Sequence, residues 1–163
     1  MKLFKNALSY EGGRCDVIYE QVNNFEDLPD DLKVKAHGVC FCDGKLLLVN
    51  HPDWNVWGIP GGTRNGGESI EETLKREILE ETNCTVIDHK PIGYLKVVSP
   101  DGGFHFRLQY ICNVRPLGEF KKDTAGNIDK ILWISPNDFE KYIEDREYKK
   151  IIISEGIREY NNI

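Results

Sequence analysis

The side chains best suited to chemistry gather in one acidic segment, residues 61–84. This segment has six acidic and three basic residues, and so carries three of the six excess negative charges of the 163-residue chain. Its central part, residues 69–82, is predicted to be a helix, because Ser69 and Glu72 have the S-x-x-E spacing of a capping box. Asn83 follows, a residue that tolerates the left-handed conformation of a helix end.

Two carboxylates of this helix are poorly explained as part of a solvated surface. At about 100° per residue, the apolar stripe of the helix is formed by Ile70, Leu74 and Ile78. Glu77 and Glu81 fall at the border of this stripe or within it. Carboxylates four residues apart repel each other, and beside a core they need a compensating cation.

Neighbouring residues do not supply enough positive charge. Arg76 can pair with Glu80 one turn later, but one arginine cannot neutralise three acids. A divalent cation bound by carboxylate oxygens can do so. The pattern therefore favours a metal site at Glu77, Glu80 and Glu81, while a salt-bridged, solvated surface explains the acids on the opposite side of the helix.

The segment resembles the box of the Nudix hydrolases, written G-x5-E-x7-R-E-U-x-E-E-x-G-U with U aliphatic. Gly62 and Glu68 stand at its first two positions, and the run that follows is Arg76-Glu77-Ile78-Leu79-Glu80-Glu81-Thr82. Every charged position of the box is filled. Asn83 replaces the glycine of the box and Cys84 replaces its last aliphatic residue, so both departures lie outside the charged positions. The preceding residues 57–62, WGIPGG, also resemble the lead-in of the family.

The resemblance implies an α/β fold, the Nudix α/β/α sandwich with a mixed central sheet flanked by helices. We expect a single Nudix domain over residues 1–163, with an N-terminal arm and loop at 1–33 and the main body at 34–163. The implied activity is Mg²⁺-dependent hydrolysis of a nucleoside diphosphate linked to another group, by attack of water at phosphorus. The alternative is a catalytically silent, nucleotide-binding regulator, but such proteins usually lack an acid of the box.

The same resemblance assigns roles to individual residues. The expected ligands of Mg²⁺, for which Mn²⁺ can substitute, are the side chains of Glu77, Glu80 and Glu81 and the backbone carbonyl of Gly61. The expected catalytic residues are Glu80, Glu77, Arg76 and Glu68. Among these, Glu80 is the preferred general base, Arg76 orients the carboxylates, and Glu68 holds Arg76 or a metal-bound water.

A second source for the general base stays open. In some members of the family the base is an acid from a late loop, and here the polar loop at 116–129 offers Glu119, Asp123 and Asp129. Asn127 occupies the place where such a glutamate often stands, which weakens this option. Simple solvation is the alternative interpretation of the three loop acids.

Candidates for substrate binding are Arg107, His105, Trp57 and Phe106. His105 and Arg107 alternate with aromatic residues along the predicted strand 104–114, so one face of that strand can reach phosphate and the other can stack a nucleobase. Core packing is the alternative role of the aromatic residues. The turn at 99–103, SPDGG, resembles that of ADP-ribose hydrolases, whereas the short chain favours a nucleoside triphosphate pyrophosphohydrolase; the sequence leaves both substrates open.

Composition limits the partners. A net charge of −6 argues against binding of a nucleic acid polymer or an anionic membrane, which require a basic face. No apolar run approaches the roughly 18 residues of a membrane span, and the N-terminal residues lack the apolar region of a signal peptide. The five cysteines include no CxxC pair, which favours reduced thiols. We therefore expect a cytoplasmic protein. The resemblance adds a small nucleotide substrate and, as an open option, the homodimer that is common in the family.

Alternation and turn residues predict the elements that must position this site. Strands are predicted at 15–20, 34–42, 45–50, 56–59, 86–98, 104–114 and 130–134. Asp43-Gly44 predicts a hairpin between the second and third of these strands, and residues 51–67 are predicted to be mostly loop. A second helix is expected to start at Ser135-Pro136, and a last helix to span 147–160, although Gly156 is unfavourable there.

Overall fold

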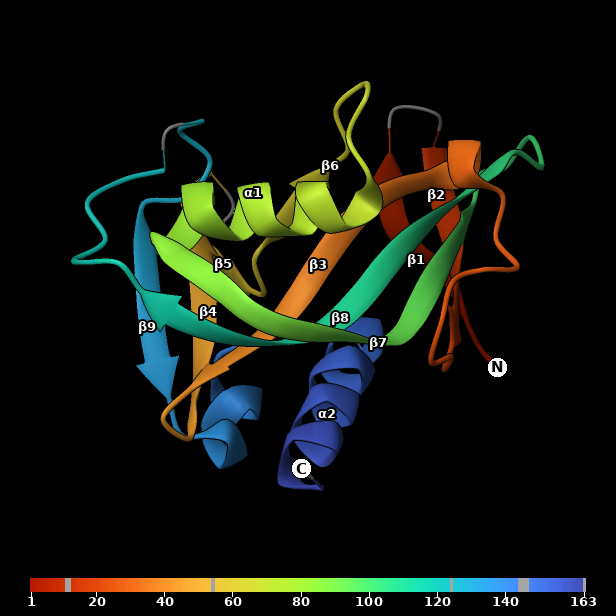
Figure 1. Cartoon of the computed structure of the whole chain (residues 1–163). Helices are drawn as coiled ribbons and strands as arrows, with labels where there is room; N and C mark the ends of the chain where they lie inside the picture. The colour runs from red at the N-terminus through yellow and green to blue at the C-terminus, as the bar shows by residue number, and fades with distance from the viewer. Residues whose placement is uncertain (11–12, 54, 124, 144–146, 163) are drawn as a thin grey trace.

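The computed structural model describes residues 1–10, 13–53, 55–123, 125–143 and 147–162. Its described residues form a curled, nine-stranded mixed sheet with one α-helix on each face (Figure 1). The strands are β1 (Lys2–Tyr10), β2 (Gly13–Glu20), β3 (Lys33–Cys42), β4 (Lys45–His51), β5 (Val56–Gly58), β6 (Gly61–Thr63), β7 (Cys84–Val98), β8 (Phe104–Pro116) and β9 (Lys130–Ile134). The helices are η1 (Asp30–Leu32), α1 (Ile70–Thr82), η2 (Pro136–Lys141) and α2 (Glu147–Asn161). The predicted α/β class is confirmed.

The order of strands in the sheet is β1-β2-β7-β8-β3-β4-β5, with β6 paired to β3 and β9 to β4. β3 and β8 run parallel, whereas β3 and β4 form an antiparallel hairpin. The hairpin turns at Asp43 (φ 49°) and Gly44 (φ 76°), as the sequence predicted. β3 pairs with β6 along its first half and with β4 along its second half, so the sheet divides at β3.

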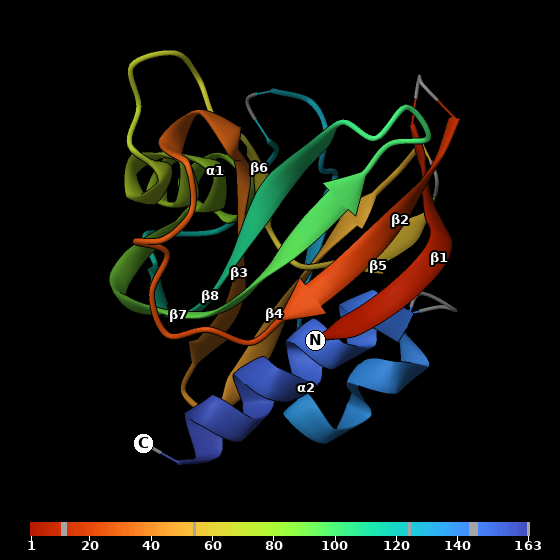
Figure 2. The ribbon, with the colours of Figure 1, turned by 90° about the vertical axis from the view of Figure 1, so that its right-hand side faces the viewer.

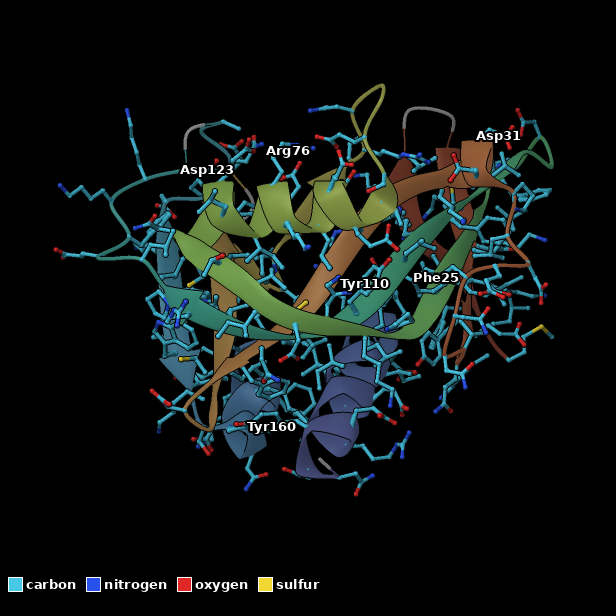
Figure 3. The ribbon with its side chains drawn as sticks, in the orientation of Figure 1. Phe25, Asp31, Arg76, Tyr110, Asp123 and Tyr160 are labelled. Carbon is cyan, nitrogen blue, oxygen red and sulfur yellow. The ribbon has the colours of Figure 1, made fainter. Side chains whose placement is uncertain are left out.

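Each helix covers its own hydrophobic cluster. The side chains of Ile70, Leu74 and Ile78 from α1 pack on one face of the sheet, and those of Ile152 and Ile153 from α2 pack on the other. Tyr110 accordingly lies between α1 and the sheet, and Tyr160 lies on the α2 side, where its ring stacks on Phe41 at 4.1 Å (Figure 3). Because the sheet is covered on both faces, its central strands are apolar on both sides.

The structure explains the unfavourable glycine of the last helix. A Cβ atom on Gly156 would lie 2.6 Å from the side chain of Val39, so a glycine allows α2 to approach β3 closely. This packing overrides the low helix propensity of glycine. None of the described helices is long and apolar enough to cross a membrane.

Three elements differ from the sequence prediction. β1 was not predicted as a strand; it forms a hairpin with β2, and β2 joins the sheet by pairing with β7 (Figure 2). β6 lies within the predicted loop, because the glycines at 61 and 62 carry no strand-like pattern. The helix that starts at Pro136 is a 3-10 helix of six residues, and Ser135 stands at its N-cap without a capping side-chain hydrogen bond. The extent of the single domain, residues 1–163, stays a prediction.

Candidate active site

The ends of α1 are set by the capping residues that the sequence predicted. The side-chain oxygen of Ser69 accepts a hydrogen bond of 3.1 Å from the backbone N–H of Glu72. Asn83 adopts the left-handed conformation (φ 55°, ψ 34°), and its N–H donates to the carbonyl of Leu79. These caps fix the rotation of the helix, so that Ile78 is buried and Glu81 is on the same side with only 3 % of its surface exposed.

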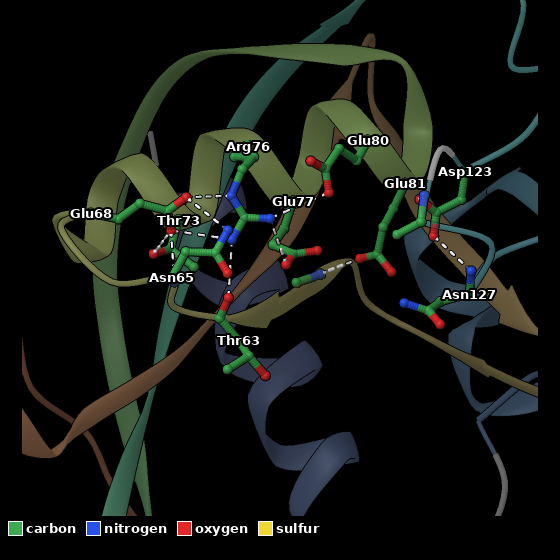
Figure 4. Close-up of polar contacts among 12 residues, drawn as sticks. Thr63, Asn65, Glu68, Thr73, Arg76, Glu77, Glu80, Glu81, Asp123 and Asn127 are labelled. Carbon is green, nitrogen blue, oxygen red and sulfur yellow. Dashed lines mark hydrogen bonds and ion pairs between the residues drawn. The ribbon is translucent and has the colours of Figure 1, made fainter.

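Arg76 lies at the centre of a network of carboxylates (Figure 4). Its guanidinium forms ion pairs with Glu68, with Glu77 at 3.0 Å and with Glu80 at 3.3 Å. It also donates to the backbone carbonyl of Thr63, on β6, at 3.0 Å. One arginine therefore ties three acids of α1 and its preceding loop to the neighbouring strand, and the pKa of Arg76 is raised above its usual range by these partners.

Glu68 connects the loop before α1 to the helix itself. Its carboxylate accepts hydrogen bonds from the Thr73 hydroxyl at 2.7 Å and from the backbone N–H of Asn65 at 3.1 Å, in addition to its ion pair with Arg76. The Arg76 contact is the main cause that lowers the pKa of Glu68 to about 2. Glu68 is therefore a carboxylate held by several donors, and it restrains Arg76.

Glu81 is the most buried acid of the group. One of its oxygens accepts a hydrogen bond of 2.7 Å from the backbone N–H of Gly61. Burial is nevertheless the dominant influence and raises the pKa of Glu81 to about 8, with the charges of Glu77, Asp123 and Glu80 acting in the same direction. Burial also raises the pKa of Glu77, against the opposing effect of Arg76. Such clustered, partly desolvated carboxylates are unfavourable without a cation.

Two consecutive glycines make room for these acids. A Cβ atom on Gly62 would lie 2.5 Å from the carboxylate of Glu77. A Cβ atom on Gly61, whose φ is +154°, would lie 2.3 Å from the backbone carbonyl of Ala36 on β3. Side chains at either position would therefore separate α1 from β6 or β6 from β3.

The chemistry of these donors fits a hard divalent cation, which prefers carboxylate and carbonyl oxygens. Among the described residues, however, no three acidic, histidine or cysteine side chains form a ready-made cluster for a metal ion. In this arrangement Arg76 pairs with both Glu77 and Glu80. These contacts use Oε1 of Glu77 and Oε2 of Glu80, so a cation would meet the other oxygen of each carboxylate while Arg76 holds the side chains in place.

The late loop contributes one acid to the same region. Asp123 is 3 % exposed, and its carboxylate accepts hydrogen bonds from the backbone N–H groups of Ala125, Asn127 and Ile128 at 2.8, 3.0 and 3.2 Å. Figure 4 shows Asp123 and Asn127 beside Glu81. The solvated role that the sequence allowed is thus wrong for Asp123, because it organises the loop, whereas Glu119 and Asp129 are exposed.

The predicted substrate-binding residues fall on different faces of the sheet. His105 and Arg107 contact each other, with 3.3 Å between Arg107 Nε and His105 Nε2. Phe106 faces the opposite side and is 6 % exposed, in the cluster under α1 between Tyr94 and Phe104. The structure therefore does not bring Phe106 together with Arg107. Trp57 packs against the α2-side cluster, its ring in edge contact with that of Tyr142.

Three further polar residues near this region were not singled out from the sequence. Lys35 and His37 lie on β3 opposite Thr63 and Gly61 of β6, and Lys149 extends from the first turn of α2. Burial lowers the pKa of Lys35, and burial lowers that of His37 well below its usual value. For Lys35 and His37, the alternation of residues in the run KVKAHG could have indicated that they share one face of a strand. The position of Lys149 depends on how α2 packs on the sheet.

Comparisons with known proteins identify relatives of this chain. The NUDIX domain model matches residues 32–154. The protein named "Putative 8-oxo-dGTP diphosphatase" from Bacillus subtilis (strain 168) is 33% identical over 92 residues, which cover 56% of this chain and 58% of that protein. The uncharacterized Nudix hydrolase YvcI of the same organism is 35% identical over 60 residues, 37% of this chain and 38% of that protein. The chain thus matches about half of the length of these relatives, or less.

Solved structures share the fold over a longer stretch. The Bacillus subtilis pyrophosphohydrolase BsRppH has a TM-score of 0.71 with 22% sequence identity, and the match covers 98% of both chains. The NUDIX domain of Shewanella oneidensis NrtR, crystallised with ADP ribose, has a TM-score of 0.60 with 24% identity, covering 78% of this chain and 87% of that one. At these identities the likeness concerns the fold.

Proposed function

Because this chain belongs to the Nudix hydrolase family, we propose that it hydrolyses a phosphoric anhydride bond in a nucleoside diphosphate linked to another group. The cofactor is a divalent cation, Mg²⁺ or Mn²⁺. The observation that carries the proposal is that the buried Glu81 is bonded to Gly61 and Glu77 lies against Gly62, while Arg76 pairs with both Glu77 and Glu80. Names of relatives such as 8-oxo-dGTP diphosphatase and pyrophosphohydrolase support a nucleotide substrate.

In this proposal the three glutamates and the carbonyl of Gly61 hold the cation. When bound, the cation screens the charge of the diphosphate and activates water for attack at phosphorus. The hydrogen bond from the Gly61 N–H keeps Glu81 directed toward β6. Arg76 holds Glu77 and Glu80 in the same region, and Glu68 fixes the position of Arg76.

Glu80 is the preferred general base. Its side chain is 29% exposed, against 15% for Glu77, so water can reach it more readily. Asp123 is a weaker candidate because both its carboxylate oxygens already accept backbone hydrogen bonds. A base must have a free lone pair directed at the attacking water.

The first test is a screen of the purified protein with Mg²⁺ or Mn²⁺ against nucleoside triphosphates, oxidised triphosphates, ADP-ribose, nucleotide sugars and dinucleoside polyphosphates. Products separated by ion exchange identify the phosphorus that is attacked. Glu80→Gln is expected to lower kcat at least about a hundredfold, as removal of an acid that acts on the reacting water should. Glu71→Gln, on the exposed face of α1, is the matched control and should leave kcat unchanged.

Two outcomes would contradict the proposal. If Glu80→Gln and Glu81→Gln hydrolysed nucleotides at the wild-type rate, these glutamates would have no role in catalysis. Nucleotide binding without hydrolysis of any compound in the panel would favour the alternative, a nucleotide-binding regulator. The NUDIX domain of Shewanella oneidensis NrtR was crystallised with bound ADP ribose. A cytoplasmic location and a homodimer also belong to this proposal; cell fractionation and light scattering test them.

A further inference from the structure

A group of cations lies next to the glutamates, on the face of the sheet that α2 covers. Lys35 of β3 and Arg107 of β8 are direct partners in the parallel register, so their side chains leave the same face of the sheet. On the same strands and the same face, Val39 and Ile111 belong to the cluster under α2. Lys35 and Arg107 thus lie where this cluster ends.

Lys149 brings a third cation to this face from α2. A Cβ atom on Gly58, at the end of β5, would lie 3.6 Å from Lys149 Nζ, which places the ammonium at the point where β5 leads to the glycines at 61 and 62. His37 lies within electrostatic reach of all three cations. Burial is the main cause that lowers the pKa of His37, and the charges of Arg107, Lys35 and Lys149 lower it further. We call Lys35, Arg107 and Lys149 the cationic strip.

The cationic strip adjoins the glutamates at Lys35. Lys35 lies opposite Thr63 in the β3–β6 ladder, and the Thr63 carbonyl accepts a hydrogen bond from Arg76. Glu77 is the acid whose charge acts on Lys35, and Arg107 acts in the opposite sense. A phosphate group held by the glutamates therefore has the strip as its neighbour.

No structural requirement accounts for Lys35. Among the residues that the structure describes, it has no carboxylate within ion-pair distance, although the side chain is largely buried and lies beside a second cation. Like charges on directly paired strand residues are destabilising. The Nδ1 atom of His37 is also buried, and within the described part of the chain it has no hydrogen-bond partner. An anion bound here would compensate the charge of Lys35 and offer a hydrogen-bond partner to Nδ1 of His37.

We propose that Lys35, Arg107 and Lys149 bind the distal phosphates of a substrate with a terminal triphosphate, and that they select such substrates over a diphosphate esterified at both ends. The inference rests on the proposed function, because the glutamates define the phosphate that reacts. A terminal phosphate has a second ionisation near neutral pH and so carries more charge than a bridging one. In ADP-ribose the corresponding position holds a neutral sugar, which supplies no negative charge to the partly buried Lys35.

The test compares kcat/KM for GTP and for ADP-ribose in wild type and in Lys35→Gln, Arg107→Gln and Lys149→Gln. Each substitution is expected to lower the value for GTP by about tenfold or more, the effect of one lost hydrogen bond to a charged group. The value for ADP-ribose should change far less. Lys35→Arg keeps the charge and should restore most of the GTP activity. Lys75→Gln, on the exposed face of α1, is the control.

Binding of inorganic tripolyphosphate without divalent cations, measured by calorimetry, separates the two proposals. Wild type and Lys75→Gln should bind it, and the three strip variants should bind at least about tenfold more weakly. Equal loss of GTP and ADP-ribose activity in the strip variants, or unchanged tripolyphosphate binding, would overturn this inference. Neither result would contradict the proposed hydrolytic function. Tripolyphosphate binding through the strip without hydrolysis of any nucleotide would overturn the proposed function alone. Circular dichroism checks that each variant is folded.

Discussion

The acidic group on α1 and the cationic strip are built in opposite ways. Glu68, Arg76, Glu77, Glu80 and Glu81 come from one continuous segment, and Arg76 contacts three of these four acids. The strip residues come from β3, β8 and α2, far apart in the sequence. The acids are placed by a single helix and the loop that precedes it. The strip depends on the register of the sheet and on the docking of α2.

The difference has a consequence for substitutions. A change within the acidic group should affect metal binding locally and leave the strip in place. A change in the packing between α2 and the sheet should affect the strip and leave the glutamates in place. Three predictions test this separation, beginning with the largest effect.

Arg76→Lys should weaken binding of Mn²⁺ by about 10- to 100-fold, the usual effect of losing a group that orients metal ligands. A lysine ammonium lacks the planar fork with which Arg76 reaches Glu68, Glu77 and the Thr63 carbonyl together. Isothermal calorimetry of the metal-free protein measures this. Arg158→Lys, at an exposed ion-paired arginine of α2, is the control. Equal Mn²⁺ affinity in wild type and Arg76→Lys would show that Arg76 does not position the ligands.

The contribution of Glu81 to the stability of the metal-free protein should fall as the pH rises. Glu81 has its pKa raised from 4.5 to about 8 in the folded state. The protonated form is therefore favoured by folding, so the contribution of Glu81 is complete below pH 4.5 and is lost as the pH rises toward 8. Denaturant unfolding at several pH values measures it. Glu81→Gln should show a smaller loss over the same range, and Mn²⁺ should reduce the loss in wild type; parallel pH profiles for the two proteins would contradict the assignment.

Gly156→Ala should affect the other region. The added methyl group would lie 2.6 Å from Val39, so α2 must shift on β3. Overpacking of this kind costs about 1–3 kcal/mol of unfolding free energy. Because Lys149 is carried by α2, we also expect a small loss of tripolyphosphate affinity, about threefold, without a change in Mn²⁺ affinity. A weaker Mn²⁺ affinity in Gly156→Ala would mean that the two regions are coupled.

The accuracy of the sequence interpretation follows the same division. The caps at Ser69 and Asn83, the buried side of Glu81 and the Asp43-Gly44 hairpin depend on neighbouring residues, and all were predicted. β6 was missed because pairing with β3, not its own composition, makes it a strand. The 3-10 form of the helix at Pro136 was missed for a different reason: a proline at the first position is compatible with an α-helix and with a 3-10 helix.

Side-chain roles beyond the helix were harder to predict. Asp123 is polar in a polar loop, and only its three backbone hydrogen bonds and its burial distinguish it from a solvated acid. Phe106 and Arg107 are adjacent in the sequence, but the alternation of a strand sends them to opposite faces. A single substrate site that includes both residues would need both faces of the sheet. The structure does not support such a site.

The sequence alone specifies the acidic group, because the period of an α-helix fixes which side chains share a face and the caps fix where the period begins. It also specifies the family, through the spacing of the same charged residues. The cationic strip and the burial of Asp123 are decided by the tertiary structure. Parallel pairing of β3 with β8 and docking of α2 join residues that no local pattern relates, and that assembly adds Lys35, Arg107 and Lys149 to the positive charge that Arg76 already supplies.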